Sequence, residues 1–183
     1  LTEASSPCVL WIDELEKAFA GAGAQGGSSE VTTRLFGSFL TWMQEKDSLA
    51  FVVATANNIS HLPPELMRKG RFDEIFYVDF PNQGEREKII SLHIGKRRSA
   101  DLAKIDIPAL ARKMKGYCGA DIESVVRDGI EAAFVAGKAH VTTEDMQAAI
   151  GRTHPISETM KDAIEEMDKT YKSKKFTNAS REE

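Results

Sequence analysis

Three short apolar runs constrain the fold of this chain most, because they have the length and composition of buried strands. They read Cys-Val-Leu-Trp-Ile at residues 8–12, Phe-Val-Val-Ala-Thr at 51–55 and Ile-Phe-Tyr-Val-Asp-Phe at 75–80. Runs this rich in β-branched and aromatic residues are typical of strands covered on both faces. Between the first two runs one apolar stripe recurs at helical spacing, formed by Leu35, Phe36, Phe39, Leu40 and Met43. The strand–helix–strand order predicts an α/β fold with a parallel sheet.

After Pro81 the sequence predicts helices only. Asn82 can cap the first of them, with Glu85 three residues later as in a capping box. Further helices are expected over residues 107–114, from about Ala120, and after Thr142 or Thr143. The helix from Ala120 should bury Ile122, Val125, Val126, Ile130, Ala133 and Phe134. The chain therefore divides into an α/β part (1–81), a small helical domain (82–155) and a C-terminal helix with a polar, disordered tail (156–183).

The acidic balance narrows the class of partner. The chain of 183 residues has a formal net charge of -4, which disfavours non-specific binding of nucleic acid. Cys8 and Cys118 lack the spacing of a zinc site or a redox pair, so we expect two free thiols in a cytoplasmic protein. No apolar run approaches the roughly 20 residues of a membrane span. The first residue is not Met, and we expect a part of a longer protein.

Asp13 and Glu14 follow the first apolar run directly. A strand end delivers side chains to the carboxyl edge of a parallel sheet, where ligands bind in open α/β folds. There, one carboxylate can hold the water shell of a metal ion while the next orients or deprotonates an attacking water. A solvated turn explains the same pair of residues equally well, so this motif leaves both interpretations open.

The stretch from Ala54 to Asp73, ATANNISHLPPELMRKGRFD, resembles the second region of homology of classic AAA ATPases. By this resemblance Asn57 is the polar sensor, and Arg68 and Arg71 are the two arginines that reach a neighbouring subunit's nucleotide. The strand ending in Asp13 and Glu14 then resembles the Walker B element. Arg68 and Arg71 lie three residues apart, so in one helical turn both could point the same way; surface salt bridges are the alternative.

A second resemblance lies in the helical part, where Gly-Ala-Asp-Ile at residues 119–122 is similar to the Gly-Ala-Asp-Leu that opens the third lid helix of AAA proteins. The resemblance implies that Gly119 and Ala120 lie close to nucleotide, and that His93 contacts its adenosine end. Taken alone, His93 fits a satisfied core histidine, and Gly119 and Ala120 fit helix capping and tight packing. The resemblance covers about residues 6–150, and several stretches are similar to a little-characterised group from cyanobacteria and plastid genomes.

The resemblance implies an incomplete parallel sheet of a P-loop AAA core, followed by a small all-α lid domain. It also implies ATP and Mg²⁺ as cofactors, a homo-oligomeric ring and a protein partner to be remodelled. Asp13 would organise Mg²⁺ through water, Glu14 would polarise the attacking water, and Asn57 would align it. The sequence contains no Gly-x-x-x-x-Gly-Lys-Ser/Thr, so this chain alone is expected to be inactive. One alternative is an assembly fragment that only supplies arginines; another, a nucleic-acid motor, is disfavoured by the acidic balance.

In the AAA fold the strand before the phosphate loop lies between the sensor strand and the final strand. The absence of that strand here leaves an open slot beside residues 75–80, with unpaired backbone groups. We therefore expect that the strands re-pair within the chain, or that another copy covers the exposed edge and face.

Overall fold

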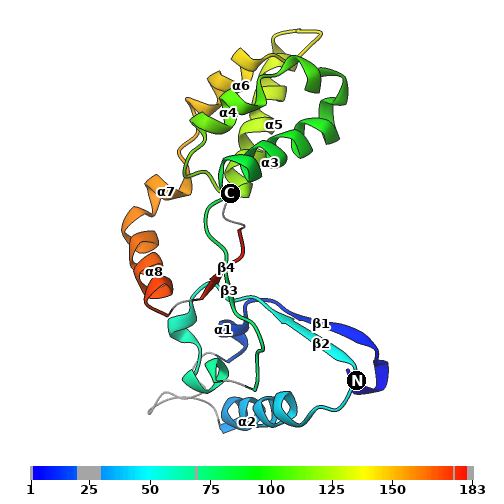
Figure 1. Ribbon diagram of the computed structural model, residues 1–183. Helices are drawn as coiled ribbons and strands as arrows, with labels where there is room; N and C mark the ends of the chain where they lie inside the picture. The colour runs from blue at the N-terminus through cyan, green and yellow to red at the C-terminus, as the bar shows by residue number, and fades with distance from the viewer. Residues whose placement is uncertain (1, 20–29, 69, 175, 181–183) are drawn as a thin grey trace. The chain divides into compact units, whose positions relative to one another are not determined.

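The computed structural model describes residues 2–19, 30–68, 70–174 and 176–180. The chain forms two compact units, Leu1–Ile75 and Phe76–Glu183 (Figure 1). This division falls before the predicted boundary at residue 82, because the third apolar run pairs with a C-terminal segment. The composition of residues 20–29, rich in Gly, Ala and Ser, predicts a flexible loop, and this segment lies outside the described residues. Among the described helices none is long and apolar enough to cross a membrane.

Unit 1 has the predicted strand–helix–strand order. Its two strands pair in parallel, with Cys8 opposite Ala50 and Ile12 opposite Ala54. A short helix follows the first strand directly, and a long helix precedes the second. The described elements are the 3-10 turn Glu3–Ser5, β1 (Cys8–Ile12), α1 (Leu15–Ala18), α2 (Glu30–Glu45), β2 (Ala50–Ala54), and the 3-10 turns Ile59–His61 and Pro64–Met67.

One face of the β1–β2 pair packs against α1, α2 and the loop after β2. Phe19 and Phe36 meet edge to face there, with ring centroids 5.1 Å apart, and Leu15 and Leu66 complete the buried cluster. The predicted stripe on α2 is confirmed at Phe36 and Met43, which are buried, but Leu35 is 59% exposed.

The opposite face of the β1–β2 pair is open, so the prediction of strands covered on both faces is wrong. Val9, Trp11 and Phe51 are 66%, 62% and 69% exposed. Side chains alternate between the two faces of a strand, and in the described part of unit 1 the helices cover one face only. The apolar runs therefore contain residues for a second layer that the described residues do not provide.

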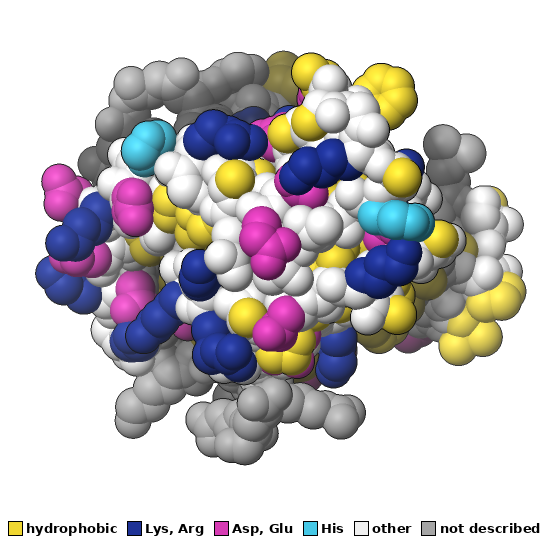
Figure 2. Space-filling model, turned by 90° about the horizontal axis from the view of Figure 1, so that it is seen from above, with side chains coloured by type: hydrophobic (Ala, Val, Ile, Leu, Met, Phe, Trp, Pro, Cys, Tyr) yellow, Lys and Arg dark blue, Asp and Glu magenta, His cyan; other side chains and the backbone are white. Residues whose placement is uncertain are grey.

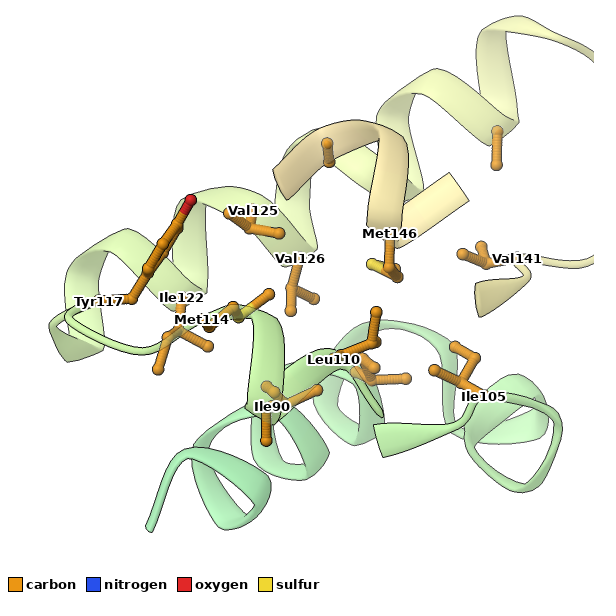
Figure 3. Close-up of a cluster of buried hydrophobic side chains, with 14 residues drawn as sticks. Ile90, Ile105, Leu110, Met114, Tyr117, Ile122, Val125, Val126, Val141 and Met146 are labelled. Carbon is orange, nitrogen blue, oxygen red and sulfur yellow. The ribbon is translucent and has the colours of Figure 1, made fainter. Parts of the chain in front are cut away.

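Unit 2 is built around one helical core. Its members come from α3, α4, α5 and α6 and from the segments between them, such as Ile105 and Val141, and Figure 3 shows them converging between these helices. Ile90, Leu110, Ile122 and Met146 are completely buried. The helical elements are α3 (Gln83–Arg98), the 3-10 helix Ser99–Lys104, α4 (Ile107–Lys113), α5 (Gly119–Val135), α6 (Thr143–Ile150), α7 (Ile156–Thr159) and α8 (Lys161–Lys174).

The helix starts follow the sequence signals. The Asn82 side chain accepts the Glu85 N–H at 2.9 Å, and the Glu85 carboxylate accepts the Asn82 N–H at 2.9 Å. The predicted capping box is thus confirmed. The inward face of α5 is confirmed at Ala133 but is wrong at Phe134, which is 78% exposed. Adjacent helical residues are rotated by about 100°, so with Ala133 inward Phe134 points outward.

The C-terminal segment returns to the start of unit 2. β3 (Phe76–Tyr77) pairs in parallel with β4 (Thr177–Asn178). Tyr171 of α8 lies against Tyr77, with ring centroids 4.8 Å apart, and Ala179 N–H donates to Tyr77 O at 2.8 Å. The expectation of a disordered C-terminal tail is therefore wrong for residues 176–179, because an aromatic contact and backbone bonds hold them. We expected that the strands beside the open slot would either re-pair within the chain or be covered by another copy. β3 re-pairs within the chain.

Candidate active site

The turn between β1 and α1 carries the two acidic residues at the carboxyl end of the sheet. Glu14 has a left-handed backbone, with φ 50° and ψ 53°, which costs a residue with a Cβ roughly 1–2 kcal/mol. Backbone bonds to the end of β2 hold this turn in place. Leu15 N–H donates to Thr55 O at 2.8 Å, and Thr55 N–H donates to Ile12 O at 2.9 Å. The two strand ends are therefore fastened to each other at the site.

Thr55 joins the Asp13 carboxylate to the Glu14 backbone through its hydroxyl. Its Oγ1 donates to Asp13 Oδ1 and accepts the Glu14 N–H at 3.2 Å. Sequence reasoning did not select Thr55. The available signal was its place as the polar last residue of an apolar run that lies beside β1 in a parallel sheet.

Asn57 lies against the start of α1. Its Nδ2 donates to Glu14 Oε1 at 3.3 Å, and its backbone N–H donates to Glu16 Oε1 at 3.1 Å. Lys17 Nζ lies 2.6 Å from the same Glu14 Oε1. The hydrogen bond and the charge of Glu14 raise the pKa of Lys17. The structure thus brings Asp13, Glu14 and Asn57 together, and Glu14 accepts from two donors.

Arg68 and Arg71 do not share a helical turn, so that part of the prediction is wrong. The 3-10 turn Pro64–Met67 ends before Arg68, whose backbone is extended with φ -77° and ψ 145°. Gly70 then adopts φ 91°, which breaks the helical path. Arg68 is exposed. Arg71 is half-buried: its Nη1 donates to Glu65 O, and its Nε is buried without a hydrogen-bond partner in the described part of the chain.

His93 lies in a polar cluster between α3 and α5. Its side chain is 14% exposed and its Nδ1 is 3.5 Å from Glu123 Oε1. Arg97 Nη1 lies 3.1 Å from the same ring nitrogen, and Arg97 Nη2 is 2.6 Å from Glu123 Oε1. The hydrogen bond from Arg97 lowers the pKa of Glu123 despite some opposing burial. His93 is therefore not surrounded by apolar side chains alone.

Gly119 and Ala120 form the exposed first turn of α5. A Cβ at Gly119 would meet no atom within 4 Å, so close packing within the chain does not explain the glycine. Glu123 follows Gly119 by one helical turn, and its contact with His93 places that histidine on the side where α5 begins. The three residues predicted to lie near nucleotide therefore all belong to unit 2.

The cluster of unit 1 suits a magnesium ion that keeps its water. Asp13, Glu14 and Asn57 present hard oxygen and amide groups, and Mg²⁺ is typically held by one or two carboxylates, water and substrate phosphates. No group of three or more His, Cys, Asp or Glu able to hold a metal occurs among the described residues. Because Mg²⁺ needs only one or two carboxylates when it keeps its water, Asp13 and Glu14 fit the part of a nucleotide site that holds the metal ion and the water. The sequence contains no phosphate loop.

Two family models match the two parts of the chain. The model described as "ATPase family associated with various cellular activities (AAA)" matches residues 1–80, and "AAA+ lid domain" matches residues 104–148. The chain belongs to the AAA ATPase family. AAA membership, predicted from the sequence, is confirmed, and so is the fold of an α/β core followed by a helical lid.

Curated relatives agree with the narrower resemblance. This AAA chain is 42% identical over 180 residues to the "Uncharacterized AAA domain-containing protein ycf46" of Pyropia yezoensis. The aligned region covers 98% of the chain and 36% of the relative. The protein of the same name from Guillardia theta is 43% identical over 166 residues (91% and 32%). "ATP-dependent zinc metalloprotease FtsH 2" of Petrotoga mobilis is 35% identical over 152 residues (81% and 24%). The AAA chain spans about a third of the length of its ycf46 relatives.

Proposed function

We propose that this AAA chain supplies the hydrolytic and lid residues of an ATPase that remodels a protein partner. The observation that carries the proposal is the cluster of Asp13, Glu14 and Asn57 at the carboxyl ends of two parallel strands, where ligands of open α/β sheets bind. Thr55 fixes its geometry through bonds to both acidic residues. This arrangement supports hydrolysis by positioned water, since phosphoryl transfer depends mostly on positioning and charge neutralisation.

Each residue of the cluster has a distinct task. Bound Mg·ATP supplies the phosphoanhydride bond and the charge to be neutralised. Asp13, oriented by Thr55, holds the water shell of the metal. Glu14 orients the attacking water and accepts its proton, and Asn57 holds the Glu14 carboxylate from the side. Lys17, whose side chain is 68% exposed, can turn into solvent and release Glu14 for this task.

The arginines and the lid supply the remaining contacts. We infer that Arg68, which is exposed, reaches the nucleotide of a neighbouring subunit in a homo-oligomeric ring. Arg71 would act beside it from a position held by the Glu65 carbonyl. On the lid, His93 would contact the adenosine end, and Gly119 and Ala120 would allow a close backbone approach at the open start of α5.

A protein partner is favoured over nucleic acid. Figure 2 shows acidic side chains interspersed among the basic ones on the face that it presents, whereas phosphate binding needs a predominantly basic surface. The FtsH relatives are named as ATP-dependent proteases, which supports ATP-driven work on a protein. The alternative of a non-catalytic fragment rests on the missing phosphate loop. The Glu14→Gln variant of a longer protein separates the two, because only a hydrolytic role makes turnover depend on Glu14.

The test of hydrolysis uses two proteins. The 183-residue chain alone should show no Mg²⁺-dependent ATPase activity. A longer protein in which the phosphate-loop half of an AAA ATPase precedes Leu1 should be active. There Glu14→Gln should abolish turnover and keep ATP bound, because it preserves shape and removes the base. Robust turnover by the chain alone would refute its expected inactivity. Robust turnover by the Glu14→Gln protein would show that the assignment of the water-activating residue is wrong.

Mixed assemblies of the longer protein test the arginines. Arg68→Ala and Arg71→Ala should reduce turnover of the assembly while leaving the affinity of a dilute monomer for nucleotide nearly unchanged. Subunits lacking an arginine should regain turnover when flanked by Glu14→Gln subunits, which keep their arginines. If mixing restores nothing, the arginines act within their own subunit or only in folding.

A further inference from the structure

Glu16 is a buried carboxylate to which the proposed mechanism gives no task. It lies on α1, two residues after Glu14, and is only 6% exposed. Its Oε1 accepts the backbone N–H of Asn57 at 3.1 Å. Its Oε2 is buried and has no hydrogen-bond partner among the described residues. A carboxylate in this environment is costly, so an apolar residue would be the more stable choice if packing were its only purpose.

The bond from Glu16 fixes Asn57 at a second point. The side-chain amide of Asn57 reaches Glu14 Oε1 at 3.3 Å, and its backbone N–H is held by Glu16. Asn57 lies after β2, in a loop segment without helical or strand bonds of its own. Both contacts run to one short helix, and together they define where the Asn57 amide points.

We propose that Glu16 is a positioning residue that holds Asn57 against Glu14. It acts through the acceptor oxygen of its side chain rather than through its charge, because the bond that it makes is to a backbone N–H. This inference rests on the proposed function of Glu14 and Asn57. It predicts that an amide oxygen at position 16 can replace the carboxylate and that an apolar side chain cannot.

The first test needs no nucleotide and uses the 183-residue chain. Hydrogen exchange followed by NMR should show the Asn57 amide exchanging about tenfold more slowly than an unprotected amide, the factor expected for a hydrogen bond of ordinary net strength. Glu16→Gln should keep this protection, and Glu16→Met should remove it. Glu45→Gln, which changes an exposed carboxylate on α2, serves as the matched control and should change nothing.

Unprotected exchange of Asn57 in the unmutated chain would overturn the proposal, and this measurement does not depend on whether Glu16→Met folds. Retained protection in a folded Glu16→Met chain would overturn it too. Loss of protection in Glu16→Gln would assign the effect to the charge and refute the acceptor role.

The second test measures turnover in the longer protein that carries a phosphate loop. Glu16→Met should lower kcat about tenfold with KM within about twofold, since Asn57 would act on the reacting water rather than on nucleotide binding. Glu16→Gln should stay near the unmutated rate. An equal loss in both variants, or a rise in KM alone, would contradict the positioning role. If Glu14→Gln leaves turnover intact, the proposed function fails, while the exchange measurement still decides whether Glu16 holds Asn57.

Discussion

Gly129 of α5 lies against Met146 of α6 in the helical unit, and replacing the glycine with alanine tests how tightly that core is packed. A Cβ at Gly129 would lie 2.7 Å from Met146 Sδ, 3.3 Å from its Cε and 3.5 Å from its Cα. Met146 is completely buried, so its flexible end has little room to move away. The added methyl group therefore has to displace a buried side chain.

Two effects of opposite sign set the magnitude. In a helix interior, alanine is more favourable than glycine by about 0.8–1 kcal/mol. Overpacking of a filled core typically costs about 1–3 kcal/mol. The net expectation for Gly129→Ala is a loss of up to about 2 kcal/mol. Gly95 in α3 is the matched control, since a Cβ there would meet nothing within 4 Å, and Gly95→Ala should stabilise the unit by about 0.5–1 kcal/mol.

The two units can be followed separately in a urea titration. Both tryptophans, Trp11 and Trp42, lie in unit 1, so their emission reports that unit, and helical circular dichroism is dominated by unit 2. Gly129→Ala should shift the dichroism transition to lower urea and leave the tryptophan transition unchanged. With Met146→Ala, which alone should cost about 2–5 kcal/mol, the double variant should lose about 1–3 kcal/mol less than the sum.

Two results would refute this reasoning. If Gly129→Ala stabilised the helical unit as much as Gly95→Ala does, the contact with Met146 would be soft. If the double variant were strictly additive, the two positions would not share the space in which the methyl group is placed.

Two further predictions concern hydrogen bonds that hold elements together. Burial alone would raise the pKa of Asp101, but hydrogen bonds from Val141 N–H, His140 and Arg98 outweigh it and lower the pKa to about 2. Because the folded pKa lies below the ordinary 3.8, Asp101 stabilises unit 2 above that pH and loses its contribution as the pH falls towards 2. Thermal melts should therefore show Asp101→Asn lowering Tm near neutral pH, with the difference vanishing near pH 2; a difference that does not change with pH would contradict this. Thr55→Val should destabilise unit 1 by about 0.5–1.5 kcal/mol in tryptophan-monitored urea unfolding, with Thr55→Ser close to the unmutated chain; equal effects of both variants would show that the hydroxyl is not responsible.

Local patterns predicted most of the helical unit, because its contacts are local along the chain. The capping box at Asn82 and Glu85 depends on residues three apart, and the inward face of α5 follows from helical spacing. The prediction that Phe134 is buried was wrong because it placed two adjacent residues, Ala133 and Phe134, on the same face of the helix. The pairing of β3 with β4 could not be predicted, since Phe76 and Thr177 are about 100 residues apart and the polar segment Thr177–Asn178 has no strand pattern.

The sequence predicted the site residues that belong to a recognisable motif. It missed the residues whose role depends only on contacts between distant segments. Asp13, Glu14 and Asn57 were identified from a strand end and a family motif, and the structure brings them together. Thr55 and Glu16 were missed because their contacts cross from the end of one strand to the start of a helix about 40 residues away. The helical turn expected for Arg68 and Arg71 does not form, because Arg68 is extended and Gly70 has a positive φ. The spacing of the two arginines in the sequence cannot predict these backbone angles.

The contacts that position the proposed hydrolytic residues are distinct from those that would hold the nucleotide. The described bonds that position Asp13, Glu14 and Asn57 include those from Thr55, Glu16 and the backbone of the two strand ends, which all lie in unit 1. None of these bonds needs a phosphate loop or a bound ligand. The cluster is therefore expected to be formed in the 183-residue chain even though that chain is predicted to be inactive. Protection of the Asn57 amide without turnover would be the signature of this state, and it would place the deficit of the chain in binding ATP rather than in the residues that hydrolyse it.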